Sequence, residues 1–178
     1  MERTAALPNG LMQRPTASLR ILGIDPGSIR CGWAVISRSG SRLERIASGV
    51  IEAGRDDMSE RLLKVYLGLR EAIVQHQPQE VAIESIFHQQ NAQSALKLGQ
   101  ARGVAILAAA QDGLALHEYE PRLVKLQVAG TGAATKEQVR AMVCMQFGLA
   151  QTMVLDESDA LAIAVCHARR PPLPLVRK

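Results

Sequence analysis

The stretch of residues 21–37, ILGIDPGSIRCGWAVIS, contains the pattern that decides the fold. An apolar run ends at Asp25, the pair Pro26-Gly27 interrupts it, and a second apolar run follows around Trp33. Apolar runs rich in β-branched residues on both sides of a Pro-Gly turn predict two neighbouring strands. A carboxylate at the end of an otherwise buried strand needs compensation, which either the turn or a cation could supply.

Working outward from this stretch, the sequence alternates between strand and helix signals. We expect strands at residues 20–25, 31–37, 44–52, 80–87 and 114–120, and helices at 58–77, 91–113, 121–130, 135–147 and from 156 to just before Pro171. The first three strands are typical of an antiparallel meander, and the later strands alternate with helices. The pattern therefore predicts an α/β fold with a mixed five-stranded sheet flanked by helices on both faces.

The 178 residues are typical of one domain with two tails. Residues 1–18 are polar and are expected to form a flexible N-terminal extension, residues 19–168 the folded domain, and residues 169–178 a flexible basic tail. The formal charge of the chain is +4, but residues 19–168 contain 15 basic and 16 acidic side chains. Any surface for nucleic acid must therefore come from local clusters of basic residues or from bound metal ions.

Composition also limits the compartment. The longest apolar run, residues 103–110, is far shorter than the ~18 residues that a membrane span needs, so we expect no membrane segment. Cys31, Cys144 and Cys166 are widely separated and odd in number, which favours reduced thiols over disulfides or a zinc site. We therefore expect a cytoplasmic protein.

Four acidic residues occur where a chain that only builds a core would not place them. Asp25 ends the first strand, Glu84 lies inside the apolar segment VAIES, and Asp156 and Asp159 are three residues apart at the start of the last helix. Carboxylates that gather in a partly buried place repel each other, and hard divalent ions such as Mg²⁺ or Mn²⁺ compensate them. Taken singly, Asp25 could be a turn residue, Glu84 could pair with a basic residue and Asp156 could cap the helix.

Three longer motifs together carry a resemblance to a known family. The segments ILGIDPGS (21–28), AIESIFHQQNAQSALKLGQARGVAI (82–106) and DESDALAIAVCHA (156–168) closely resemble the RuvC family of bacterial Holliday junction resolvases. The resemblance extends from about residue 19 to residue 168, and NAQSALKLGQARG is its most specific part.

The resemblance implies a ribonuclease H-like nuclease that acts as a homodimer on four-way DNA junctions in recombination and repair. The catalytic and metal-binding acids of the family correspond to Asp25, Glu84, Asp156 and Asp159, with Asp25 expected to bridge two Mg²⁺ ions, for which Mn²⁺ would substitute. Water activated by the metal would attack the scissile phosphate and leave 5′-phosphate and 3′-hydroxyl ends. The RuvA–RuvB branch-migration complex is the partner that the resemblance implies.

The resemblance also implies a set of DNA-binding residues. Phe87 matches an aromatic position where the family stacks a ring on an unpaired base, an interaction worth ~1–3 kcal/mol. Lys125 and Lys136 match basic residues that face phosphate, and Arg122 and Arg140 are expected to support them electrostatically. The role of His88 stays open.

Two other functions fit parts of the sequence. The string GIDPGS also fits the phosphate loop of actin-like ATPases, although the chain has no room for a second lobe. A junction-binding protein without catalysis is the other alternative, and the four intact acids argue against it. Gly99 and Gly103, four residues apart on one helix face, allow either tight packing within the chain or a contact between subunits of the dimer.

Overall fold

The computed structural model describes residues 18–85 and 91–170. In these residues the chain forms five strands and five helices in the expected order. Their bounds are β1 Leu19–Asp25, β2 Arg30–Ser39, β3 Arg42–Glu52, α1 Met58–His76, β4 Glu80–Glu84, α2 Ala92–Ala110, β5 Ala115–Tyr119, α3 Pro121–Ala129, α4 Lys136–Phe147 and α5 Leu155–Ala168.

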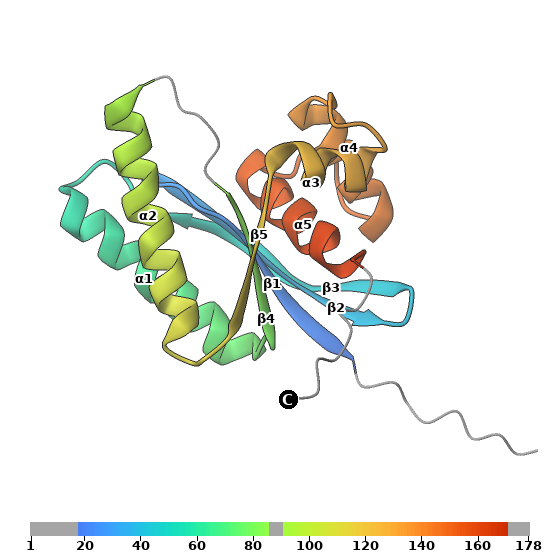
Figure 1. The fold of residues 1–178 in the computed structure, drawn as a ribbon, viewed down its shortest axis with the longest axis horizontal. Coiled ribbons are helices and arrows are strands. Elements are labelled where there is room, and N and C mark those ends of the chain that lie inside the picture. Colours follow the sequence, from blue (N-terminus) through green and yellow to red (C-terminus); the bar gives the residue numbers. More distant parts are fainter. Residues whose placement is uncertain (1–17, 86–90, 171–178) are drawn as a thin grey trace, which may run out of the picture.

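The strands form one mixed sheet in the order β3-β2-β1-β4-β5. Strands β1, β2 and β3 are antiparallel neighbours, whereas β4 pairs parallel to β1 and β5 pairs parallel to β4. Helices α1 and α2 cover one face of the sheet, and α3, α4 and α5 cover the other (Figure 1). The predicted α/β fold with helices on both faces is therefore confirmed.

Each face of the sheet has its own hydrophobic core, because successive side chains of a strand point to opposite faces. In β1, Leu22 and Ile24 pack into the core under α1 and α2, while Ile21 packs into the core under α5. In β4, Val81 and Ile83 belong to the first core. The next residue of each strand, the acid that ends it, is therefore directed to the α5 face.

Helix α5 lies unusually close to the sheet because two glycines face it. A Cβ atom on Gly23 would come within 2.2 Å of the carbonyl oxygen of Ala160, and one on Gly32 within 1.9 Å of the carbonyl oxygen of Asp156. No side chain fits at such distances without moving the helix. These two glycines therefore fix how near the N-terminal half of α5 approaches β1 and β2.

Several local signals in the sequence are found in the structure. Asn91 caps α2 through bonds from the backbone N–H groups of Gln93 and Ser94, and Thr135 and Gln138 form the capping box of α4. All three cysteines are buried thiols. In the part of the chain that the structure describes, no helix combines the length and the apolar character needed to cross a membrane.

Strand β4 is shorter than expected, ending at Glu84 instead of residue 87. Its neighbour β1 is paired with it only as far as Ile83, and the pairing with β5 ends at Glu84 with Tyr119. The N–H of Ser85 still donates to the carbonyl of Tyr119, which is the last residue of β5, so β4 loses its partner on that side at this point.

Candidate active site

Two of the four predicted acids lie at the same edge of the sheet. Asp25 and Glu84 each end a strand, directly after Ile24 and Ile83, which are partners in the parallel ladder of β1 and β4. Both acids face α5 by the alternation described above. Parallel strands bring their carboxyl ends to one edge, which explains why two acids 59 positions apart in the sequence become neighbours.

The other two acids come from the first turns of α5. Asp156 and Asp159 are three residues apart and therefore share one face of the helix. The helix begins after Val154 and has no side-chain cap, so Asp156 is not the capping residue. The partial positive charge of a helix N-terminus favours carboxylates at these positions.

The pKa of Asp25 shows that the four acids lie near one another. Burial, and after it the negative charges of Asp159, Glu84 and Asp156, raise the pKa of Asp25 from 3.8 to about 8, against the opposing charge of Lys136. The pKa of Glu84 is also raised, first by burial and then by the charge of Asp159. Two carboxyls with raised pKa values beside other carboxylates are the electrostatic signature of a site that needs cations.

Two lysines supply part of the positive charge that compensates these carboxylates. Lys136, the first residue of α4, places its Nζ 2.5 Å from Oδ2 of Asp159. Burial alone would lower the pKa of Lys136, but this hydrogen bond and the charges of Asp159, Asp25 and Glu84 raise it, so the amine stays protonated. Lys136 and Lys125 line a cleft of about 190 Å³ together with Glu84 and Asp159.

The donor set of this cluster fits hard divalent ions, because all four side chains offer carboxylate oxygen. Burial and the neighbouring negative charges disfavour the ionised form of Asp25, and a bound cation would stabilise it. A second group of potential metal ligands in the described residues is formed by Glu80, His117 and His167, whose donor atoms all lie within 4.8 Å of one another. In the part of the chain that the structure describes, no three of the four acids bring their carboxylate oxygens this close together.

The loop after Asp25 is held by a buried arginine of α1. The guanidinium of Arg61 donates to the backbone carbonyl of Ser28 at 2.5 Å and to the Ser28 hydroxyl at 2.6 Å. Gly27 makes the turn possible, since a Cβ atom there would lie 2.0 Å from the carbonyl of Arg30. Asp25 is thus both a residue at a turn and a member of the acidic cluster.

Comparison with known proteins supplies the decisive observation. The family model described as crossover junction endodeoxyribonuclease RuvC matches residues 21–167. The chain is 50% identical over 149 residues to the protein of that name from Citrifermentans bemidjiense, with 83% of this chain and 91% of the relative covered. It is 52% identical over 148 residues to the one from Pseudomonas putida, covering 83% and 85%.

The chain belongs to the RuvC family. Its fold is similar to that of RuvC from Thermus thermophilus in a complex with a Holliday junction substrate, with a TM-score of 0.79, 31% identity and coverage of 84% and 93%. A yeast mitochondrial Holliday junction resolvase shares the fold with a TM-score of 0.62, 15% identity and coverage of 87% and 79%. The expected ribonuclease H-like resolvase fold is thereby confirmed.

Membership of the RuvC family makes the chain a crossover junction endodeoxyribonuclease, and the family implies that catalysis depends on divalent metal ions. The family match therefore decides against the alternative of an actin-like ATPase, which the string GIDPGS alone left open.

The residues predicted to bind DNA have different surroundings. Lys125 and Lys136 line the cleft beside the acids, whereas Arg122 and Arg140 are not among its lining residues. The guanidinium of Arg140 donates to the carbonyl of Met153 at 3.3 Å and so supports the segment that leads into α5. Phe87, like His88, lies outside the described residues.

A second groove with basic residues in its lining, which the sequence did not indicate, begins at the acidic cluster. A groove of about 880 Å³ has Asp156 in its wall, and its lining includes three basic residues, Arg30, Arg55 and Lys97, and also Glu52, which forms an ion pair with Arg30 at 3.2 Å. The three basic residues come from β2, from the segment after β3 and from α2, so no sequence spacing connects them. Only the folded chain brings them to one groove.

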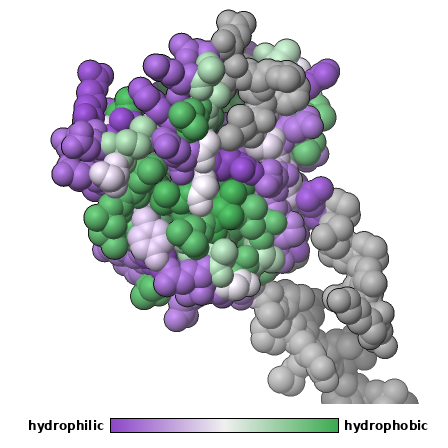
Figure 2. Space-filling model, turned by 60° about the vertical axis from the view of Figure 1, so that its left-hand side comes forward, coloured by the Kyte–Doolittle hydropathy of each residue, from purple (hydrophilic) through white to green (hydrophobic). Residues whose placement is uncertain are grey.

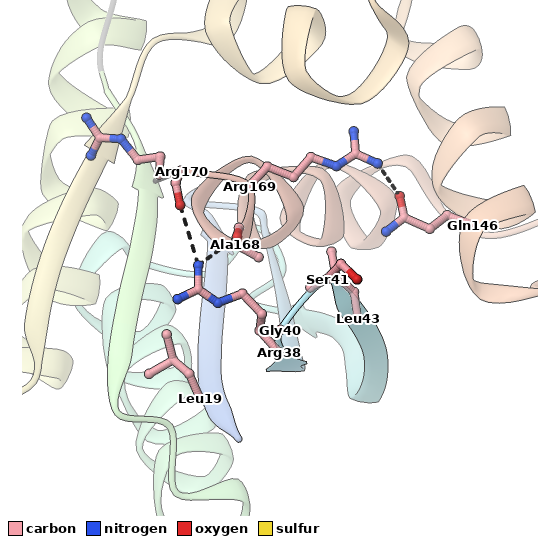
Figure 3. Close-up of a pocket in the computed structure, with 9 residues that line it drawn as sticks. All are labelled: Leu19, Arg38, Gly40, Ser41, Leu43, Gln146, Ala168, Arg169 and Arg170. Carbon is pink, nitrogen blue, oxygen red and sulfur yellow. Dashed lines mark hydrogen bonds between the residues drawn. The ribbon is translucent and has the colours of Figure 1, made fainter. Parts of the chain in front are cut away.

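A third pocket, of about 710 Å³, lies far from the acids, beside the β2–β3 turn and the C-terminal end of α5 (Figure 3). Arg38 reaches across it and donates to the carbonyl of Ala168 at 2.8 Å, and Arg169 donates to the side-chain oxygen of Gln146 at 2.9 Å. A cation at the last carbonyls of a helix stabilises the helix end. The arginines of this pocket therefore have a structural role in holding the end of α5.

Proposed function

We propose that this protein resolves four-way DNA junctions by hydrolysing phosphodiester bonds with Asp25, Glu84, Asp156 and Asp159 as its catalytic, metal-binding acids. The observation that carries the proposal is the gathering of four carboxylates around Asp25, whose pKa is raised to about 8. A cluster so unfavourable on its own is expected to hold divalent cations.

The donor set supports Mg²⁺, with Mn²⁺ as a substitute, and the family resemblance implies two ions. When bound, the ions would supply an activated water and would neutralise the leaving oxygen, which yields 5′-phosphate and 3′-hydroxyl ends. Asp25, between Glu84 on one side and the acids of α5 on the other, is the residue best placed to contact both ions. Gly23 and Gly32 keep Asp156 and Asp159 close enough to the sheet to take part.

The basic residues support a path for the DNA backbone on both sides of the acids. Lys125 and Lys136 line the cleft, and Arg30, Arg55 and Lys97 line the groove that begins at Asp156. Lys136 has a double role in this proposal. It compensates Asp159 when no other cation is bound, and it turns to phosphate once divalent ions take over that compensation. Phe87 keeps the base-stacking role, and Arg122 and Arg140 keep the role of electrostatic support, that the family resemblance implies.

We propose that the active form is a homodimer that joins through α1 and α2. Figure 2 shows hydrophobic side chains gathered on the side that these helices form. Leu63, Leu67 and Val74 of α1 and Leu96 and Leu107 of α2 are each more than half exposed. A Cβ atom on Gly103 would meet nothing within 4 Å, so this glycine is not explained by packing within the chain. A subunit contact explains both the glycine and the exposed leucines.

Two symmetric active sites would let such a dimer cut two opposing strands of a junction. The RuvA–RuvB complex remains the partner that the family implies, and a pull-down of the full chain on junction DNA loaded with RuvA and RuvB would test it.

The test of the catalytic proposal is cleavage of a synthetic four-way junction by the wild type and by Asp25→Asn, with and without Mg²⁺. We expect the variant to bind the junction and to cut at least a hundredfold more slowly, a barrier increase of about 2.7 kcal/mol. Glu157→Gln is the matched control, because Glu157 is also acidic and lies beside Asp156 but bonds to the hydroxyl of Ser48 instead. A variant Asp25→Asn that binds and cuts as fast as the wild type would contradict the assignment.

A further inference from the structure

A second cluster of ionisable side chains lies at the opposite ends of the elements that carry the catalytic acids. Glu80 begins β4, four residues before Glu84, and His167 lies eight residues after Asp159 on α5. These separations correspond to about 13 Å along a strand and about 12 Å along a helix. His117, from β5, completes the cluster, which is therefore separate from the site described above.

The three side chains converge from three different elements. Nε2 of His167 lies 2.5 Å from Oε2 of Glu80, and Nε2 of His117 lies 4.0 Å from the same oxygen. The rings of the two histidines are 4.6 Å apart between centroids, and one donor atom from each of the three residues lies within 4.8 Å of the others. A tetrahedral ion with bonds of about 2.0–2.1 Å separates its ligands by about 3.3 Å, so small side-chain rotations would close a site here.

The chemistry of these donors differs from that of the catalytic acids. Two imidazole nitrogens and one carboxylate suit a borderline ion such as Zn²⁺, which takes His and Glu ligands, and not Mg²⁺, which prefers oxygen alone. His167 is buried, whereas the side chains of His117 and Glu80 are 22% and 33% exposed. An ion can therefore enter from the solvent side, where water can complete its coordination.

The far side of the cluster is built to orient His167. The hydroxyl of Tyr119 lies 2.6 Å from Nδ1 of His167, and the guanidinium of Arg170 donates to that hydroxyl at 3.1 Å. Metal-binding histidines typically engage their second ring nitrogen in such a bond, which fixes the ring and selects the nitrogen that faces the ion. With Nε2 on a metal, the ring proton lies on Nδ1 and the oxygen of Tyr119 accepts it.

We propose that Glu80, His117 and His167 form a zinc-binding site that ties the C-terminal end of α5 to the β4–β5 edge of the sheet. Strand β5 is an edge strand, so it has a neighbour on one side only. An ion shared by β4, β5 and α5 links this edge to the helix that carries Asp156 and Asp159. Its role is to stabilise the fold, and it takes no part in the hydrolysis.

The test is a titration of the full-length chain with Zn²⁺, followed by calorimetry and thermal unfolding in excess Mg²⁺, so that the catalytic carboxylates are already occupied. We expect one Zn²⁺ per chain and a rise in the melting temperature, because an ion that binds only the folded state stabilises it. His117→Asn and Glu80→Gln are expected to weaken Zn²⁺ binding at least tenfold. His117 is partly exposed and Glu80→Gln keeps a partner for His167, so both variants should fold.

His76→Asn is the matched control, because His76 lies at the end of α1 and stacks on Trp33, away from the cluster. Its Zn²⁺ affinity should equal that of the wild type. Co²⁺ used as a coloured substitute should give the absorption bands of tetrahedral coordination in the wild type and lose them in His117→Asn. Absence of saturable Zn²⁺ binding, or equal affinity of His117→Asn and the wild type, would overturn the proposal. Because both readouts measure binding, they are independent of whether the junction is cut.

Discussion

Four carboxylates gather at one end of the β4–α5 pair, whereas at the other end a single carboxylate lies between two imidazoles. In the first group, burial and then the charges of the neighbouring carboxylates raise the pKa of Asp25 to about 8, because Lys136 offsets only part of the negative charge. In the second group, Glu80 already has His167 as a hydrogen-bond partner at 2.5 Å. At one end of this helix and strand, negative charge therefore exceeds positive charge. At the other end, the single carboxylate already has a hydrogen-bond partner.

The difference shows why position within an element matters more than residue type. The acidic end of α5 is its N-terminus, where the helix dipole favours negative charge, and the end with His167 is its C-terminus, where it favours positive charge. Glu84 and Glu80 are the same residue type on one strand, yet we assign catalysis to the first and a structural bond to the second. The same substitution made at each end tests whether the two ends differ in function.

The largest expected effect comes from removing one carboxylate charge at each end of β4. Glu84→Gln should lower the rate of junction cleavage in Mg²⁺ at least a hundredfold, about 2.7 kcal/mol in the barrier, because it removes a ligand from the cluster. The loss for Glu84→Gln should exceed the loss for Glu80→Gln by at least about thirtyfold. Single-turnover rates with saturating enzyme measure both. Equal losses would mean that the two ends are not functionally distinct.

The second expected effect is an opposite pH dependence of folding stability at the two ends in the absence of divalent ions. The pKa of Asp25 is raised in the folded state, so the folded chain keeps a proton that the unfolded chain releases. Stability from this group is fully present below about pH 3.8 and is lost as the pH rises through about 8. Asp25→Asn should remove that loss, which amounts to several kcal/mol at about 1.4 kcal/mol per pKa unit.

The other end should behave in the opposite sense. Burial lowers the pKa of His167 below its usual 6.5, against the hydrogen bond of Glu80, so the folded chain releases a proton that the unfolded chain keeps. Stability from His167 is present above pH 6.5 and is lost as the pH falls. Urea unfolding at a series of pH values, with chelator and then with Mg²⁺, measures both slopes. A slope that Asp25→Asn leaves unchanged near pH 7–8 would contradict the charge deficit at the acidic end.

The smallest expected effect concerns the exposed apolar surface of α1 and α2, which is separate from both clusters of ionisable residues. Leu107→Glu places a charge on the exposed apolar surface of α2 and should weaken the dimer at least tenfold in sedimentation at micromolar concentration. Met145→Glu on α4 is the control, since Met145 is equally exposed outside that surface. Gly103→Leu should act like Leu107→Glu. A wild type that is monomeric, or variants that dimerise unchanged, would exclude α2 as the contact.

Much of the fold followed from local signals in the sequence. The apolar run that ends at Asp25, the caps at Asn91 and Thr135, and Pro121 at the start of α3 act within a few residues and are visible without a structure. The length of β4 was wrong because a strand ends where its neighbours end, and that depends on pairing with β1 and β5.

The nearness of the four acids could be predicted for a related reason, because each is an exception to an apolar pattern and the family motifs connect them. Their role as metal ligands stays a prediction. The cluster of Glu80, His117 and His167 could not be predicted, because its members are 37 and 50 positions apart and each fits its own element without contradiction. The groove residues Arg30, Arg55 and Lys97 were missed likewise, since ordinary exposed charges give no signal until the fold brings them together.

The central claim is that the four acids form one site for hard divalent ions, distinct from the histidine cluster. Anomalous diffraction from crystals of the full chain grown with Mn²⁺ tests it most directly. We expect Mn²⁺ peaks between Asp25, Glu84 and the first turn of α5, with Lys136 moved away from Asp159. Mn²⁺ bound elsewhere, or an acidic cluster that holds no ion in crystals of protein that cleaves junctions with Mn²⁺, would contradict it.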